Sequence, residues 1–188
     1  KAAKELEVLV KQALVDLNFI AVEFEIQITR KESIGENGFD NVEFMISTNP
    51  GESVKPLVKV ASGGEMSRVM LAIKTHVMAN FKLSTMIFDE IDTGVSGKAA
   101  QKIGFKLKEV GKNRQVLCVT HLSQIAVMAN HHLLIEKKVE GERTSTHVTP
   151  LDLEGRVQEI ARIMAGDSPS KLMLQSAREA LQQAQEAE

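Results

Sequence analysis

Two acidic residues stand at the end of a short apolar run. Thr85–Phe88 (TMIF) leads directly into Asp89 and Glu90. Short apolar runs are typical of strands buried in a parallel sheet, and ligands bind beyond the carboxyl ends of such strands. Asp89 offers a carboxylate of the kind that holds Mg²⁺, directly or through water. Glu90 is then placed to polarise a water molecule for in-line attack on a phosphoryl group.

A histidine follows the next apolar run. Gln115–Thr120 (QVLCVT) leads into His121. If the two runs are parallel strands, His121 lies on the same edge as Asp89 and Glu90, where it can reach a terminal phosphate or an attacking water. A lone histidine at a strand end is more often structural, and two solvated acids there are equally ordinary. The functional interpretation of Asp89, Glu90 and His121 is stronger because the three residues occur together in one sequence.

A serine and two glycines begin the helical run upstream. Ser62 is a good N-cap residue and Glu65 lies three positions later, which makes a capping box. Gly63 and Gly64 then occupy the first helical positions, where alanine or proline would form a better first turn. The free N–H groups and the positive end of the helix dipole attract anions. Gly-Gly is explained if a phosphate docks here, although the pattern alone is a weak signal.

Periodicity predicts an α/β scaffold for these residues. Helical spacing continues from Ser62, and helices alternate with short apolar strands, which predicts a mainly parallel sheet with helices on both faces. In Ser96–Arg114, the side chains of Lys98, Lys102 and Lys106 share one helix face. We interpret this basic face as a solvated surface in preference to a DNA contact.

Antiparallel hairpins and terminal helices complete the predicted scaffold. One hairpin pairs a half-buried strand, Phe19–Arg30, with Val42–Thr48 around a turn at Lys31–Asp40. Another pairs His132–Val139 with Arg143–Thr149 around a glycine turn. The predicted terminal helices are Lys1–Leu17, Leu153–Ala165 and Ser170–Glu188.

Composition is that of an ordinary globular domain. The chain has 188 residues, is 43% hydrophobic and 26% charged, and carries a net charge of −2, so no basic excess indicates a nucleic-acid partner. The single cysteine, Cys118, excludes an internal disulfide framework, and we interpret it as a core residue. The chain begins at Lys1 without a methionine, a signal peptide or a membrane-spanning run. We expect it to be a fragment.

The order of these motifs resembles the head of ABC-type ATPases. The fuller wording, in VASGGEMSRVMLAIK, IFDEIDTGVSGKAA and QVLCVTHLSQIA, is similar to that of the RecN family of SMC-like bacterial DNA double-strand-break repair proteins. The similarity runs from about Ala21 to Gly166 and departs from many ABC signatures at Ala61, where they have leucine. The matching elements are a signature motif at Ser62–Glu65, a Walker B motif at Met86–Glu90, a D-loop at Asp92 and a switch histidine at His121.

The resemblance implies a role for each of these residues. Two heads would sandwich two ATP molecules, with Mg²⁺ as cofactor, and head closure and opening would tether or release DNA. The implied roles are contact with the γ-phosphate of the other subunit for Ser62, Gly63 and Gly64, Mg²⁺ placement for Asp89, general base for Glu90, γ-phosphate sensing for His121 and coupling of the two sites for Asp92.

A phosphate-binding P-loop is missing from this sequence. The motif needs Gly-x-x-x-x-Gly-Lys-Ser/Thr, and the nearest candidate, Gly94–Ala99, has too short a glycine spacing and no hydroxyl at Ala99. RecN-like chains carry the P-loop in an N-terminal lobe, beyond a long coiled coil. The resemblance therefore implies that residues 1–188 are the C-terminal lobe of an ABC/SMC-like P-loop NTPase head, with 1–17 ending a coiled-coil arm and 168–188 forming the last helix.

The implied partners are the N-terminal lobe, a second head in a homodimer, and DNA, but no membrane. The implied location is cytoplasmic and nucleoid-associated.

Two alternative functions remain open from the residues alone. A DEAD-like helicase core would explain Asp89–Asp92 but should carry a Ser-Ala-Thr-type motif where this chain has Val119-Thr120-His121. A non-catalytic DNA-tethering module with relict motifs is disfavoured by intact Glu90 and His121.

Overall fold

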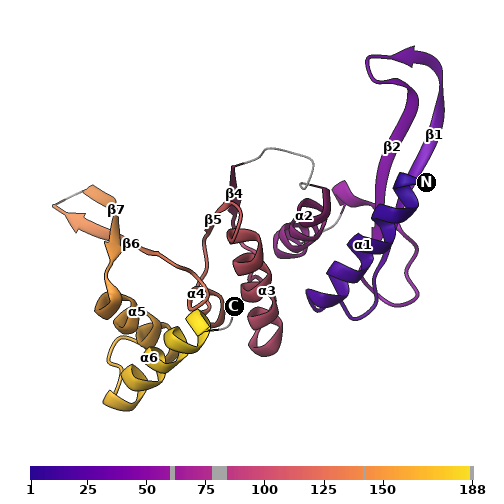
Figure 1. The fold of residues 1–188 in the computed structure, drawn as a ribbon. Coiled ribbons are helices and arrows are strands. Elements are labelled where there is room, and N and C mark those ends of the chain that lie inside the picture. Colours follow the sequence, from indigo (N-terminus) through magenta and orange to yellow (C-terminus); the bar gives the residue numbers. More distant parts are fainter. Residues whose placement is uncertain (60–61, 78–83, 142, 187–188) are drawn as a thin grey trace.

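The computed structural model describes residues 1–59, 62–77, 84–141 and 143–186. Figure 1 shows the order of the elements along the chain. The helices are α1 (Ala2–Asp16), α2 (Gly63–Val77), α3 (Gly97–Gly111), α4 (Ser123–Ala126), α5 (Leu153–Ala165) and α6 (Lys171–Glu186), with a 3₁₀ turn at Leu57–Lys59. The strands are β1 (Glu23–Gly35), β2 (Gly38–Ser47), β3 (Lys55–Pro56), β4 (Thr85–Phe88), β5 (Gln115–Cys118), β6 (His132–Glu140) and β7 (Arg143–Leu151).

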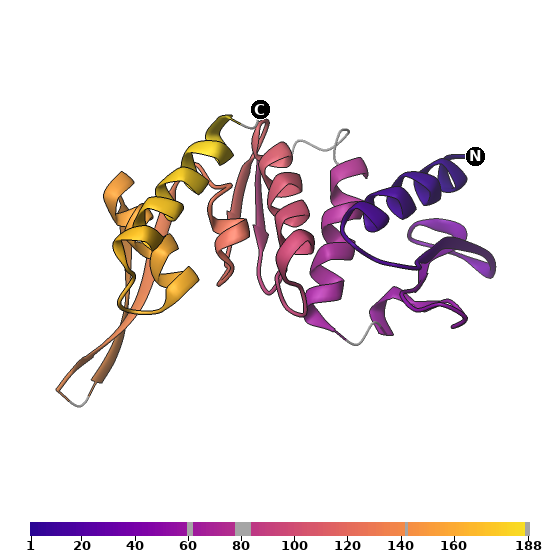
Figure 2. The same cartoon turned by 90° about the horizontal axis from the view of Figure 1, so that it is seen from below.

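Strands β4 and β5 form the parallel pair on which the predicted sites depend. Thr85 faces Gln115 and Phe88 faces Cys118, so the two strands end side by side. Met86 and Phe88 point into the main hydrophobic core, which α1, α2 and α3 supply with apolar side chains. Figure 2 shows α3, α2 and α1 in succession on one side of this strand pair. The predicted parallel pairing is confirmed.

The opposite face of β4 and β5 is open, contrary to the prediction that helices cover both faces. Ile87 is 67% exposed, and Leu117 and Val119 are also exposed. Cys118 is half-buried against the core, and burial raises the pKa of its thiol to about 12, so it stays protonated and unreactive at neutral pH. The apolar pattern of the strands predicts burial on both faces, but the described residues cover only one.

The β1–β2 hairpin is longer than predicted. The sequence pattern places a turn over Lys31–Asp40, yet β1 continues to Gly35 and β2 resumes at Gly38, after a two-residue turn. Gly38 adopts a φ of 93°, which favours glycine. Only the base of the hairpin is buried, and its far end projects from the molecule (Figure 1). The cluster of turn residues predicts one long loop, whereas only its centre forms the turn.

A second core lies around α5 and α6. Val157, Ile160 and Leu181 are buried together there, and two residues that follow α4, Val127 and Met128, join them. The predicted β6–β7 hairpin is confirmed, and so is the predicted helix that starts near residue 170. Residues 187 and 188 of that predicted helix, and Ala61 of the signature motif, lie outside the described residues. Helix α1 matches the predicted Lys1–Leu17 helix, and its place at the end of an arm stays a prediction.

Candidate active site

The acidic pair lies where β4 ends. Asp89 and Glu90 are both exposed, and the Asp89 carboxylate accepts a hydrogen bond from the Glu90 backbone N–H at 2.9 Å. Glu90 has a φ of 56°, in the left-handed region that residues with a side chain adopt uncommonly. Such a conformation costs free energy and is found preferentially at functional sites. It turns the chain sharply after the strand, so that Ile91 and Asp92 enter the interior.

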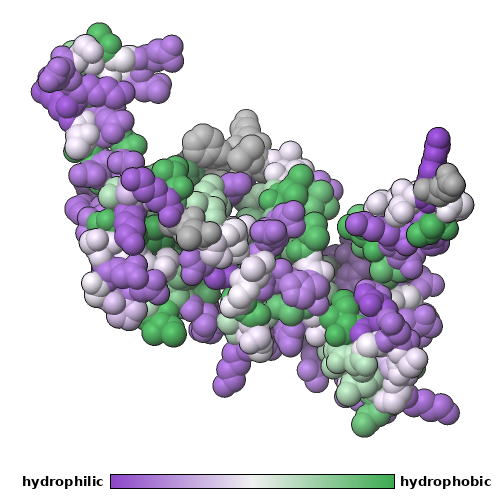
Figure 3. Space-filling view, turned by 180° about the vertical axis from the view of Figure 1, so that it is seen from behind, coloured by the Kyte–Doolittle hydropathy of each residue, from purple (hydrophilic) through white to green (hydrophobic). Residues whose placement is uncertain are grey.

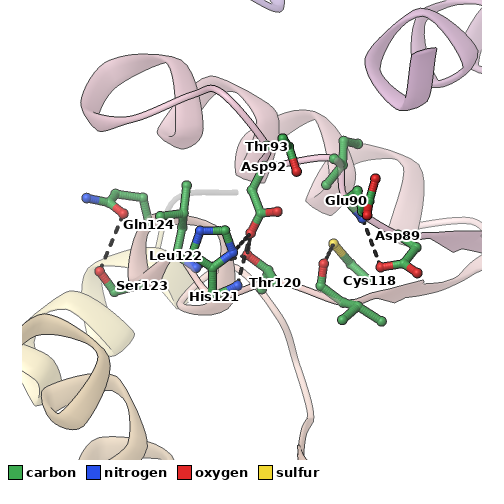
Figure 4. A network of polar contacts seen from close by, with 12 residues as sticks. Asp89, Glu90, Asp92, Thr93, Cys118, Thr120, His121, Leu122, Ser123 and Gln124 are labelled. Carbon is green, nitrogen blue, oxygen red and sulfur yellow. Dashed lines mark hydrogen bonds and ion pairs between the residues drawn. The ribbon is translucent and has the colours of Figure 1, made fainter. Parts of the chain in front are cut away.

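Asp92 joins the ends of the two strands. Its side chain is 3% exposed, and Oδ2 accepts hydrogen bonds from the Thr120 hydroxyl at 2.6 Å and the His121 backbone N–H at 2.9 Å. The His121 ring, which is 74% exposed, brings Nδ1 to 3.1 Å from the same oxygen. Figure 4 shows this ring beside the Asp92 carboxylate. The structure therefore places His121 on the same edge as the acidic pair, as the sequence predicts.

The Asp92 carboxylate lies against one nitrogen of the His121 ring. Nδ1 is the ring nitrogen that lies 3.1 Å from Asp92 Oδ2. Nε2 is then the ring nitrogen that is left for a ligand. A carboxylate that orients one ring nitrogen and leaves the other for a ligand is a common arrangement at sites that handle protons or phosphates.

The glycines of α2 pack against the chain's own acidic turn. A Cβ built on Gly64 would lie 2.6 Å from the Thr93 carbonyl oxygen, and one on Gly63 would lie 2.5 Å from Glu90 Oε2. The Ser62 hydroxyl accepts the predicted capping bond from the Glu65 N–H at 3.4 Å. Close approach thus explains the glycines without a ligand, and it also brings the start of α2 beside the Glu90 carboxylate.

Two residues that sequence reasoning missed hold α2 against this turn. Ser67 donates to the Asp89 carbonyl at 2.8 Å, and Arg68 donates to the Thr93 carbonyl at 3.0 Å and the Ile91 carbonyl at 3.4 Å. Arg68 is buried, its guanidinium lies 5.3 Å from the centre of the Phe19 ring, and burial lowers its pKa. The sequence feature that indicates this role is the position of Arg68, four residues after Gly64 on the apolar face of α2.

We expect Asp92→Asn to lower the free energy of unfolding of this chain by about 1 kcal/mol, because a neutral amide oxygen accepts more weakly than a carboxylate. Urea denaturation measures the change. Asp40→Asn, at an exposed position of β2, is the matched control and should leave stability unchanged. Equal stability of the two variants would contradict an energetic role for the Asp92 contacts.

Metal binding at this edge would need help from outside the chain. Within the described ranges, no three His, Cys, Asp or Glu side chains lie close enough together to hold a metal ion. Asp89 nevertheless offers an exposed carboxylate, and Mg²⁺ in phosphate-processing sites takes one or two carboxylates plus phosphate oxygens and waters. The donor chemistry of Asp89 fits that partial role.

None of the described helices has the length and apolar character to cross a membrane.

Comparison with known proteins shows a family for this chain. No protein-family model matches it. The DNA repair protein RecN of Halalkalibacterium halodurans is 50% identical over 160 residues, which are 85% of this chain and 28% of the relative. RecN of Treponema pallidum is 44% identical over 178 residues, which are 92% of this chain and 31% of the relative. The chain belongs to the RecN family. It spans under a third of the length of either RecN relative.

Solved structures give the fold independently. An SMC head domain with a coiled coil from Pyrococcus yayanosii matches with a TM-score of 0.58 at 17% identity, over 97% of this chain and 29% of that one. A structure from a study of ATP-driven dimerization and DNA-stimulated activation of SMC ATPases matches with a TM-score of 0.54 at 17% identity, over 89% of this chain and 96% of that one. The RecN-type chain therefore has the fold of part of an SMC head, as its motifs predict.

Proposed function

We propose that this chain is the C-terminal lobe of an SMC-like, ATP-hydrolysing head that acts in DNA double-strand-break repair. One observation carries the proposal: the start of α2, the Asp89–Glu90 turn and the Asp92-oriented His121 meet at one edge of the β4–β5 pair. That constellation can surround a terminal phosphoryl group. The RecN relatives are named as DNA repair proteins, and a structural neighbour belongs to SMC ATPases, which supports the same assignment.

Each side chain then has a step in hydrolysis. Glu90 takes a proton from the attacking water, and the exposed Nε2 side of His121 faces the γ-phosphate. Asp89 would hold Mg²⁺, which when bound neutralises charge on the phosphates. Ser62 and the amides of Gly63 and Gly64 contact a γ-phosphate carried by a second head. Asp92 couples the two nucleotide sites, because a movement of its turn is transmitted to His121 through their hydrogen bond.

The nucleotide itself must arrive on another segment, because this sequence has no P-loop. The open face of β4 and β5 is a suitable place for that segment, since Ile87, Leu117 and Val119 expose apolar side chains there. From behind, hydrophobic residues gather over the middle of the molecule, where these strands lie (Figure 3). The RecN relatives extend well beyond the matched region, so we propose that their additional lobe covers this face.

Head dimerisation on ATP would control DNA tethering in a cytoplasmic, nucleoid-associated protein.

The basic residues of α3 are only a weak indication of where DNA would contact this chain. Lys98 and Lys102 are exposed, but Lys106 forms an ion pair with Glu109 at 2.8 Å. This pattern is typical of a solvated helix face, so we do not assign DNA binding to it.

We expect this chain alone to hydrolyse ATP negligibly, because a single lobe without the P-loop cannot hold the nucleotide. Addition of the P-loop lobe, expressed separately or linked, should restore turnover. Phosphate release measured on each preparation is the test, and buffer with the P-loop lobe alone is the control. Appreciable turnover by the purified chain would contradict the division of the site between two lobes.

A further inference from the structure

The residues that join β5 to β6 form a segment with His121 near its start. We define the connecting segment as residues 120–132, which include the first residue of β6; it contains α4 and then the buried pair Val127 and Met128. We propose that Gly104 of α3 and Arg156 of α5 are positioning residues for His121, which act by fixing the connecting segment between the two cores. The catalytic consequence rests on the function proposed above, whereas the positioning itself does not.

The connecting segment passes from one core to the other. Ile125 is buried in the main core, together with β4 and the inner face of α3. Two residues later, Val127 and Met128 are buried in the second core, with residues of α5 and α6. A short segment with side chains anchored in both cores cannot shift without disturbing one of them. Its first residues, Thr120 and His121, are tied to Asp92.

Gly104 brings α3 and α4 into backbone contact. A Cβ on this residue would lie 2.9 Å from the Gln124 carbonyl oxygen, 3.0 Å from Met128 Cγ and 3.3 Å from Ile125 Cα. Glycine inside a helix costs about 1 kcal/mol relative to alanine, so the close approach is the reason to have it here. The contact lies three residues after His121 in the chain. Any group larger than hydrogen at Gly104 must therefore push α4 away from α3.

Arg156 holds the far end of the connecting segment. It is 7% exposed and donates to the Ala129 carbonyl at 2.7 Å, while its Nε has no hydrogen-bond partner among the described residues. Within the part of the chain that the structure describes, it forms no ion pair with a carboxylate, and burial lowers its pKa. By contrast, Arg162 on the same helix is paired at the surface with Glu159 at 2.8 Å. Burying a guanidinium with so few partners is costly, which indicates a specific role for its contact with Ala129.

A histidine closes the same end of the segment. His132 Nε2 lies 2.8 Å from the Ala126 carbonyl oxygen. Burial lowers the pKa of His132, so the ring is neutral at neutral pH and Nε2 carries the proton that it donates. Residues 126–132 are thus folded back on themselves, which links Ala129, the residue that Arg156 holds, to Ala126 at the end of α4. Figure 4 shows the other end, where Leu122–Gln124 lead away from the His121 ring.

Gly104→Ala and Gly111→Ala form a matched pair for the test. Both substitutions are in α3, but a Cβ on Gly111 meets no atom of the described residues within 4 Å. The backbone amide of His121 is observed by ¹H–¹⁵N spectra and hydrogen exchange in this chain. Gly104→Ala should shift the His121 amide signal and speed its exchange several-fold, because the Asp92 bond is weakened, while Gly111→Ala should change neither.

Arg156→Met and Arg156→Lys test the other anchor. Methionine keeps the apolar bulk without a donor, so the His121 amide signal should shift, and lysine should restore it by donating to Ala129. In the full-length protein, Gly104→Ala and Arg156→Met should lower kcat several-fold with KM for ATP unchanged. If Arg156→Met does not fold, the glycine pair alone decides.

Two outcomes separate this proposal from the proposed function. Folded Gly104→Ala and Arg156→Met variants with an unchanged His121 amide would overturn the positioning role. A shifted His121 amide with unchanged kcat would support positioning and remove His121 from the hydrolysis step.

Discussion

Glu90→Gln in the full-length protein is expected to lower ATP turnover by about two to four orders of magnitude while ATP binding persists. Glutamine has the shape of glutamate but cannot take a proton from the attacking water. The position also favours an effect on chemistry alone, because the Glu90 side chain is exposed and, among the described residues, only the approach of Gly63 constrains it. ATP-bound closed dimers should then accumulate.

The measurements are phosphate release, nucleotide binding by fluorescence and dimerisation by light scattering. Glu32→Gln makes the same chemical change on the exposed part of β1, so it controls for loss of a negative charge. It should leave all three quantities unchanged. If Glu90→Gln hydrolysed ATP at the original rate, Glu90 would not be the base, and another acid would have to be sought on the second lobe.

The sequence was sufficient for the main features of the site. Strand ends could be read from short apolar runs that stop at Asp89 and at His121, and parallel pairing follows from the helix between them. The capping bond of Ser62 could be read from residue types three positions apart. These are local signals, and each places a candidate site residue at one edge of one strand pair.

Longer-range contacts could not be predicted. The Asp92 carboxylate is buried against Thr120 and His121, 28 and 29 residues away, and no local pattern indicates these contacts. Arg68 reaches Thr93 across 25 residues, and no pattern within α2 reveals its partner. The open face of β4 and β5 was missed for a different reason. Its apolar residues have the composition of a buried strand, but they are exposed in the part of the chain that the structure describes.

The two glycines of α2 should respond differently to alanine. At Gly64 the added Cβ would meet backbone, with the Thr93 oxygen at 2.6 Å and the Glu90 oxygen at 3.0 Å. Backbone at a turn tied by Arg68 cannot move aside cheaply. We therefore expect Gly64→Ala to destabilise the chain by about 1–3 kcal/mol, despite the better helix propensity of alanine.

At Gly63 the added Cβ would meet only the end of a flexible side chain, Glu90 Oε2 at 2.5 Å. The carboxylate can rotate away, so Gly63→Ala should leave the free energy of unfolding nearly unchanged. It should nevertheless lower ATP turnover in the full-length protein, because the proposed base is displaced. Urea denaturation of this chain and phosphate release by the full-length protein distinguish the two effects.

This pair also tests why the glycines are there. If Gly64→Ala were as stable as the natural chain, the acidic turn would be free to move, and close packing would not explain Gly64. A bound phosphate would then be the better reason for glycine at the start of α2. If instead Gly64→Ala unfolds early and Gly63→Ala does not, one glycine maintains the turn and the other leaves room for the carboxylate that acts there.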